Sequence, residues 1–309
     1  MIKKLSRILK SKNAQLSRID NIHSILDNDI KSPKVNLGKI QATLNRSSNI
    51  RYLRDIEFQV FSQWGDDGII QYLIDKINIP NKTFIEFGVE NYKEANTRFL
   101  LINNNWSGYV IDGGKDNIEY IKKDSVFWAF DIHAKCAFIT KDNINKLLSE
   151  FIKKGYDPEI GILSIDIDGN DLWVWKEINV VSPIIVIVEY NAVLGIEKAW
   201  SIPYKEDFYR HDAHDSFQYW GASLKAFYNL GQSKGYAFLG CNGNGNNAYF
   251  VRRDKLGGLR ELTLSEGFVD SKFREYVDAR GERVGGRARL DLIKGMPMYN
   301  AETDKIENI

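Results

Sequence analysis

Cysteine is scarce in this sequence, and long apolar runs are absent from it. The 309 residues include two cysteines, Cys136 and Cys241, which are too few for a disulfide framework and typical of a reducing compartment. No stretch approaches the roughly 20 apolar residues that cross a bilayer, and no apolar run of signal-peptide length follows the basic residues 1–5. We therefore expect a cytoplasmic protein without a membrane span.

An excess of charge of one sign is also missing. The 42 Lys and Arg residues nearly balance the 41 Asp and Glu residues, so the formal net charge is +1 and nucleic acid is not an expected partner. Internal repeats of the length that builds repeat proteins, about 20–50 residues, and low-complexity tracts are absent as well. With 43% hydrophobic residues, the chain is long enough for one large core with appendages.

Residues 1–57 form a polar, basic extension. Up to Val60, twelve Lys and Arg residues face five Asp and Glu residues. Apolar residues recur at helical spacing, as at Leu16, Ile19 and Leu26, and this periodicity predicts one or two amphipathic helices. Such helices pack on the main domain or on a second subunit, which would give a homodimer. A membrane-surface helix is the weaker alternative, because the apolar face lacks aromatic anchors.

Residues 58–255 alternate strand-like and helix-like segments, and we expect them to form a catalytic domain. Several strand segments are apolar throughout, which is typical of parallel strands covered on both faces. Strands that alternate with helices favour a Rossmann-like, doubly wound, mostly parallel α/β sheet. The predicted strands lie at 84–87, 108–111, 126–130, 160–165 and 184–188.

Two further strands, at 236–239 and 248–251, flank a loop rich in Gly and Asn, and this pattern predicts an antiparallel hairpin. A parallel sheet that ends in such a hairpin outlines the class I methyltransferase fold. Residues 256–309 form a polar extension that we expect to pack loosely or to close over the site. Its arginines could bind a phosphate-bearing acceptor or form a solvated surface; they are Arg280, Arg283, Arg287 and Arg289.

Open α/β sheets bind ligands at the carboxyl ends of their strands. At the end of the first predicted strand, Gly88 lets the backbone approach a ligand, and Glu86 can accept a hydrogen bond from a cationic amine. The full glycine pattern of a pyrophosphate site is missing. Asp112 follows Gly88 by 24 positions, close to the offset at which an acidic residue binds ribose hydroxyls. These features fit S-adenosylmethionine, a cationic cofactor without phosphate.

Other polar residues are candidates for the same pocket. Asp131 follows the third predicted strand and is a candidate for the adenine amino group. Upstream, residues 62–68 cap a helical run, and Gln63 and Trp64 are free to line the cofactor or substrate pocket.

Four oxygen-bearing side chains follow the fourth and fifth predicted strands: Asp166, Asp168, Glu189 and Asn191. Adjacent parallel strands bring such residues together, and hard oxygen ligands suit Mg²⁺ or Mn²⁺. An ion held there would lower the pKa of an acceptor oxygen. The alternative is that these side chains position cofactor and substrate by hydrogen bonds alone.

His211 and His214 follow the fifth strand at a spacing of three, which would place both on one face of a helix. Either is a candidate general base for deprotonating a hydroxyl, and so is a carboxylate such as Asp168. Both histidines could instead be metal ligands or solvated loop residues.

Taken together, these motifs resemble the FkbM-like group of class I methyltransferases over roughly residues 58–254. The motifs are Ser62-Gln63-X-Gly65-X-Asp67-Gly68, Phe84-Ile85-Glu86-Phe87-Gly88, Asn96-Thr97-Arg98-X-Leu100-Leu101, Ile111-Asp112-Gly113, Asp166-Ile167-Asp168-Gly169 and Val188-Glu189-Tyr190-Asn191. The resemblance implies that the cofactor contacts Glu86, Gly88, Asn96, Thr97, Asp112 and Asp166, with Gly113 beside them. The tips of the fourth and fifth strands also resemble the Mg²⁺ site of catechol O-methyltransferase.

The resemblance implies O-methylation of a small molecule: a sugar, a sugar nucleotide or a phosphorylated capsule precursor. The first alternative is an NAD(P)-dependent oxidoreductase, which would need the Gly-X-Gly-X-X-Gly pattern that is missing here. The second alternative is a non-catalytic subunit that binds the cofactor.

Overall fold

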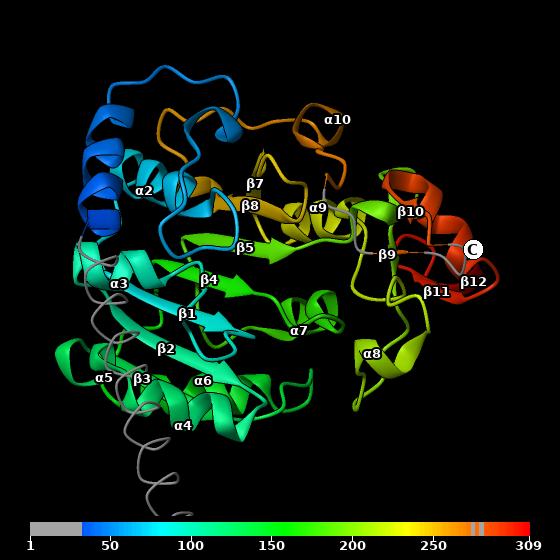
Figure 1. Cartoon of the computed structure of the whole chain (residues 1–309), viewed down its shortest axis with the longest axis horizontal. Coiled ribbons are helices and arrows are strands. Elements are labelled where there is room, and N and C mark those ends of the chain that lie inside the picture. Colours follow the sequence, from blue (N-terminus) through cyan, green and yellow to red (C-terminus); the bar gives the residue numbers. More distant parts are fainter. Residues whose placement is uncertain (1–32, 273–275, 278–280) are drawn as a thin grey trace, which may run out of the picture.

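The computed structural model describes residues 33–272, 276–277 and 281–309 (Figure 1). The amphipathic pattern predicted for the beginning of the chain falls mostly on residues 1–32, which lie outside the described residues, as does Arg280. The domain boundaries at 57/58 and 255/256 stay a prediction. Among the described residues, no helix is long and apolar enough to cross a membrane.

The core of the molecule is a seven-stranded sheet in the order β3-β2-β1-β4-β5-β8-β7. The first five strands of that order pair in parallel, and β8 is antiparallel to both of its neighbours. This topology confirms the predicted fold class, a Rossmann-like, mostly parallel sheet that ends in an antiparallel hairpin. The strands are β1 (Thr83–Phe87), β2 (Ser107–Asp112), β3 (Ile132–Cys136), β4 (Ile162–Ile165), β5 (Ile185–Glu189), β7 (Tyr236–Cys241) and β8 (Asn247–Arg252).

Both faces of the sheet are buried, because successive side chains of a strand point to opposite faces. On β5, Val186 and Val188 belong to one apolar cluster, whereas Ile185 and Ile187 belong to the other. The first cluster is covered by α6 (Ile144–Ile152), α7 (Asp171–Glu177) and α9 (Leu224–Ser233). The second is covered by α2 (Asp66–Lys76), α3 (Arg98–Asn104), α4 (Lys115–Lys123) and α5 (Ser125–Ala129).

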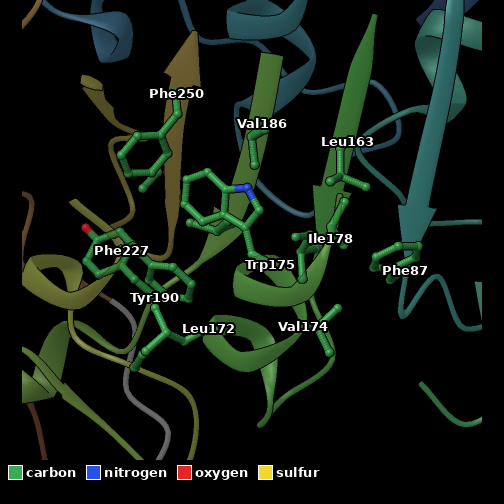
Figure 2. Close-up of a cluster of buried hydrophobic side chains, with 14 of the residues drawn as sticks. Phe87, Leu163, Leu172, Val174, Trp175, Ile178, Val186, Tyr190, Phe227 and Phe250 are labelled. Carbon is green, nitrogen blue, oxygen red and sulfur yellow. The ribbon is translucent and has the colours of Figure 1, made fainter. Parts of the chain in front are cut away.

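Trp175 anchors α7 to the sheet. Its indole lies among Val186, Phe250 and Phe227 (Figure 2), and its ring centroid is 5.1 Å from that of Phe250. Replacing a buried Trp by Ala typically costs about 3–5 kcal/mol. This anchor fixes the start of α7, where Asp171 accepts hydrogen bonds from the backbone N–H groups of the loop after β4. The core thus holds one of the loops that form the site.

The third predicted strand is wrong. Residues 126–130 carry the aromatic and β-branched composition of a strand, yet Ser125–Ala129 is the helix α5. Asp124 caps this helix by accepting a hydrogen bond from the Val126 N–H at 3.1 Å, and such a cap favours a helical turn over an extended chain. The strand follows instead as β3, shifted towards the C-terminus by six residues.

The C-terminal extension packs tightly, not loosely. Its strand β11 (Pro297–Asn300) pairs with β12 (Lys305–Asn308) and with β6 (Trp200–Ser201), forming a three-stranded sheet. This sheet lies on a third apolar cluster: Leu194, Ile202, Phe208, Tyr219, Trp220, Ile293 and Met298. Arg287 makes two hydrogen bonds to Glu197, and Arg289 is buried, so these two predicted phosphate-binding arginines are engaged within the protein.

The remaining elements lie mainly beyond the carboxyl ends of the strands or along the edges of the sheet (Figure 1). They are η1 (Leu53–Ile56), η2 (Ala192–Leu194), α8 (Arg210–Ala213), η3 (Arg253–Lys255), α10 (Leu264–Gly267), β9 (Tyr276–Val277), β10 (Arg283–Val284) and η4 (Gly286–Ile293). Residues 33–45 are helical.

Candidate functional site

A cavity of about 710 Å³ opens at the carboxyl ends of β1, β2, β4 and β5. Most of the residues predicted from the sequence line it, namely Gln63, Glu86, Gly88, Asn96, Asp112, Gly113, Asp166, Asp168, Glu189 and His211. Four others do not line it: Thr97, Asp131, Asn191 and His214. The sheet therefore brings the acidic strand ends together as the parallel topology requires.

Glu86 is buried at the end of β1 and fastens the loop that follows. Its carboxylate accepts hydrogen bonds from the Asn96 N–H at 2.9 Å, the Thr97 N–H at 3.1 Å and the Thr97 hydroxyl. Burial raises the pKa of Glu86 to about 7, although these hydrogen bonds oppose the rise. Thr97 is fully buried, so it acts by holding Glu86 and not by lining the cavity.

Gly88 lies where the ends of β1 and β4 come closest. Its φ is +69°, and a Cβ atom at this position would overlap the carbonyl oxygen of Asp166. The sequence predicted that Gly88 admits a ligand; the structure shows that it admits the backbone of the neighbouring strand end. Only glycine combines this φ with this approach, so the geometry of both strand ends depends on it.

Asp112 ends β2 and is largely buried beside the cavity. Its Oδ1 accepts hydrogen bonds from the Gly114 N–H at 2.7 Å and from Asn117 Nδ2 at 2.9 Å. Its Oδ2 accepts one, from the Glu90 N–H at 2.8 Å. Because each carboxylate oxygen can accept about two hydrogen bonds, Oδ2 retains one acceptor position for a ligand hydroxyl.

The next two strand ends carry an acidic pair, Asp166 after β4 and Glu189 at the end of β5. The register pairs Ile165 with Val188, so the two carboxyl groups are neighbours. Burial raises the pKa of both groups well above the ordinary range; the charge of Asp166 raises the pKa of Glu189 further, whereas a hydrogen bond with Glu189 opposes the rise at Asp166. Two adjacent buried carboxyl groups in this state share a proton at neutral pH.

Asp168 makes an ion pair across the cavity mouth. Its Oδ1 lies 2.7 Å from Arg210 Nη1. Arg210 also donates a hydrogen bond to the Phe217 carbonyl and lies over the Trp220 ring at 4.5 Å. This ion pair ties the loop after β4 to α8.

These side chains do not fit the predicted metal site. Asn191 turns away from the cavity: it accepts a hydrogen bond from the Val193 N–H and donates two, to the carbonyls of Gln218 and Trp220. The Arg210 guanidinium binds Asp168 where a cation would be expected. In the described part of the chain, no group of three or more His, Cys, Asp and Glu side chains is placed to hold a metal ion.

The two predicted histidines do not share a helical face. His211 lies on α8 and lines the cavity mouth, with its ring near those of Tyr209 and Phe217. The helix ends at Ala213, and His214 is extended. The Nδ1 atom of His214 bonds to the Ser216 hydroxyl and backbone N–H, so this residue shapes the loop after α8.

Two acidic residues that the sequence placed at a helix end support the cavity wall at Gln63 and Trp64. Asp67 Oδ2 accepts hydrogen bonds from the N–H groups of residues 60, 61 and 62 at 2.7–2.8 Å, and burial raises the pKa of Asp67 to about 6. Asp66 accepts hydrogen bonds from the hairpin residues Asn242, Asn247 and Tyr249. The sequence placed acidic residues near the start of α2, where Asp66 and Asp67 lie in the first turn, but it did not indicate these distant partners.

Asp131 lies at the wrong edge of the sheet for a cofactor contact. It precedes β3, and both of its carboxylate oxygens accept hydrogen bonds from the Tyr156 hydroxyl. The residues that do reach the cavity from this strand follow its other end, at Ala137, Phe138 and Ile139. Sequence reasoning missed them because it placed the strand too early in the chain.

No family model and no curated protein matches the sequence. Solved structures match at low similarity. An S-adenosylmethionine-dependent methyltransferase from Clostridium acetobutylicum is 11% identical with a TM-score of 0.36, over 62% of this chain and 91% of that one. A SAM-dependent methyltransferase from Aquifex aeolicus is 11% identical with a TM-score of 0.33, over 60% and 89%. The N-terminal domain of EvdMO1, crystallised with SAH bound, is 10% identical with a TM-score of 0.34, over 55% and 72%. Likenesses this distant assign neither a family nor an activity.

Proposed function

We propose that this protein is a methyltransferase that uses S-adenosylmethionine and transfers the methyl group to a hydroxyl of a small molecule, in the cytoplasm. The observation that carries the proposal is the charge of the cavity at the ends of the parallel strands. Among the described residues it is lined by one arginine, Arg210, and seven carboxyl groups: Glu86, Glu90, Glu94, Asp112, Asp166, Asp168 and Glu189. Asp166 and Glu189 share a proton and Glu86 has a pKa of about 7, but the acidic groups still outnumber the one arginine. Such a lining favours a cofactor with a sulfonium and an ammonium group over one with phosphates.

The alternative of a dinucleotide-dependent oxidoreductase is disfavoured at β1. A pyrophosphate is bound by a glycine-rich turn at a helix N-terminus. Here Glu86 and Glu90 flank Gly88, and both line the cavity. A pyrophosphate in that position would lie against two carboxylates. The antiparallel hairpin of β7 and β8 is also foreign to the plain dinucleotide-binding sheet.

The cofactor would lie along the ends of β1 and β2. Asp112 Oδ2 would accept a ribose hydroxyl with its remaining acceptor position, beside Gly113. Asp166, with Asn96 nearby, would face the ammonium group. The adenine ring would pack against the apolar residues after β3, of which Phe138 is 51% exposed; an exposed aromatic ring at a cavity edge suits a stacked base.

The methyl group would then move from sulfur to oxygen in one displacement. The carbon–sulfur bond breaks with its electron pair left on sulfur, the carbon–oxygen bond forms, and the hydroxyl proton passes to a base. His211 is the histidine that lines the cavity, and we assign the base to it, since Asp168 is held by Arg210. Alignment of the two reacting atoms can supply about 7–11 kcal/mol of the lowered barrier.

The acceptor would be a sugar or similar polyol that carries no phosphate. The acidic lining of the cavity opposes phosphate in the acceptor as it does in the cofactor. Arg287 and Arg289 are engaged elsewhere in the fold. Of the acceptors that the sequence suggested, the unphosphorylated sugar therefore fits this charge best, and nucleotide-linked sugars fit it least.

Isothermal titration with S-adenosylmethionine and with NADH tests the proposal. We expect binding of the first and none of the second, and loss of S-adenosylmethionine binding in Asp112→Ala with the far-ultraviolet circular dichroism unchanged. Methyl transfer to unphosphorylated sugars, followed with a labelled methyl group, separates an enzyme from a subunit that only binds the cofactor. Binding of NADH, or unchanged cofactor affinity in Asp112→Ala, would contradict the assignment.

A further inference from the structure

The helix at residues 33–45 packs one side on its own domain and carries exposed apolar residues on another. On the inner side Gly38 and Asn45 are buried. A Cβ atom on Gly38 would lie 2.6 Å from Val60 and 2.9 Å from Phe99, and Asn45 Nδ2 donates a hydrogen bond to the Ile56 carbonyl at 2.8 Å. The helix is therefore held firmly against the body, and its orientation is fixed.

The outer side carries a stripe of three exposed aliphatic residues. Leu37, Ile40 and Leu44 are 66%, 57% and 62% exposed. Their spacing of three and four places them on one face of the helix. Burying aliphatic side chains of this kind is favourable, so a partner that covered all three would be stabilised by each of them.

The spacing of this stripe continues through the beginning of the sequence. Counting back from Leu44 in alternating steps of four and three reaches Ile2, and ten of the thirteen positions are Leu or Ile. The three exceptions are Lys12, His23 and Pro33. The residues before 33 lie outside the described part of the chain, so the repeat is a property of the sequence there. A Leu and Ile heptad repeat of this length is typical of a coiled coil between copies of one chain.

Pro33 precedes the three exposed residues. Proline disturbs a helix on its N-terminal side, because it lacks the N–H that would bond to the carbonyl four residues earlier and its ring clashes with that carbonyl. The stripe from Leu37 onward therefore meets no break.

We propose that the face formed by Leu37, Ile40 and Leu44 is an interface at which this chain associates with another copy of itself. The occupant of the stripe is the same helix of the second copy, which presents the same three residues. Each subunit keeps its cavity open, because the helix contacts the body near Val60 and Phe99 and neither residue lines the cavity.

The test is the mass of the full chain in solution. Light scattering coupled to size exclusion should give two or more times the 35.5 kDa of one chain for the wild type. The variant Leu37→Glu/Ile40→Glu/Leu44→Glu should give the mass of one chain, with the circular dichroism spectrum unchanged because the three side chains are exposed. A matched control, Tyr120→Glu/Trp128→Glu/Ile306→Glu, introduces the same charge at three exposed apolar residues elsewhere and should leave the wild-type mass unchanged.

Two results would overturn the proposal. One is a wild type that sediments as a single chain at every concentration from micromolar to submillimolar, a measurement that needs no variant. The other is a triple variant that folds and keeps the wild-type mass, since association would then use another surface. Sedimentation with phosphatidylglycerol vesicles tests whether a lipid surface binds the face instead. If the protein is a single chain and binds vesicles through these three residues, the face binds lipid and not a second copy.

Discussion

Gly88 is the residue at which the strand ends on two sides of the cavity meet. Its backbone touches that of Asp166, so the loop after β1 and the loop after β4 have a fixed separation. Glu86 and Thr97 hold the same loop from the other side. The positions of the cofactor-binding candidates therefore depend on a few close backbone contacts, and substitutions at those contacts should act through stability.

We expect Gly88→Ala to lower the free energy of unfolding by about 3 kcal/mol, because alanine is strained at this φ and its Cβ overlaps a carbonyl oxygen. Gly113→Ala is the matched control: its Cβ would meet Phe138 at 3.6 Å, an ordinary contact, and we expect a change below about 1 kcal/mol. Urea unfolding followed by circular dichroism measures both. Equal effects in the two variants would show that the close approach at Gly88 is not strained.

The buried acids predict how stability depends on pH. Glu86 has an ordinary pKa of 4.5 and a pKa of about 7 in the fold, and the pKa values of Asp67 and Asp171 are raised to about 6. Between the lower and the raised value, the folded state binds a proton that the unfolded state has lost. The free energy of unfolding should therefore fall as the pH rises from about 4.5 to about 7.

Urea midpoints across this pH range measure the effect. Glu86→Gln replaces the carboxyl group by a permanently neutral one, so the fall between pH 4.5 and pH 7 should be smaller in this variant than in the wild type. A wild-type midpoint that stays level or rises with pH over the same range would contradict the burial of these groups.

At the scale of elements, long apolar runs were predicted well and local turns were not. The strands β1, β2, β4 and β5 lie where their apolar runs indicated, because a buried parallel strand has little choice of composition. The run at 126–130 had the same composition, but the Asp124 side chain caps its first turn and favours a helix. The acidic residues at the strand ends were predictable because they directly follow these strands. The positions of the Asn191 and His214 side chains depend on turns, which residue spacing does not specify.

The displaced strand leads to a prediction about cofactor binding. Asp131 is at the amino end of β3 and Phe138 follows its carboxyl end, so we expect Asp131→Ala to leave the affinity for S-adenosylmethionine unchanged. Phe138→Ala should weaken it by about tenfold, since stacking on an aromatic ring is worth roughly 1–3 kcal/mol per base. Isothermal titration compares the two, and the reverse order of effects would restore the adenine role to Asp131.

At the scale of the whole molecule, the C-terminal extension is part of one folded unit. Its strand β11 pairs with β6, and its apolar residues pack with Phe208, which lies two residues before α8. A pairing between segments about 100 residues apart leaves no mark in local composition. For this reason the sequence indicated a polar extension and gave no sign of the second sheet.

The variant Met298→Ala tests whether the C-terminal extension unfolds together with the rest of the protein. Met298 is 1% exposed in the third cluster, so its truncation should cost about 2–4 kcal/mol. Ile306→Ala, on the neighbouring strand and 56% exposed, should cost less than about 1 kcal/mol. Wild type and both variants should unfold in a single urea transition. A separate early transition that Met298→Ala alone shifts would mean that the extension folds independently.

The hydrogen bonds of Asp66 determine how late the pocket is completed while the chain is synthesised on the ribosome. Asp66 lies close to Gln63 and Trp64 in the sequence, and its hydrogen-bond partners Asn242, Asn247 and Tyr249 are 176, 181 and 183 positions later. Domains begin to fold during synthesis, and contacts this distant along the chain form late. A nascent chain halted before Asn242 would contain all five parallel strands and still lack a finished binding pocket.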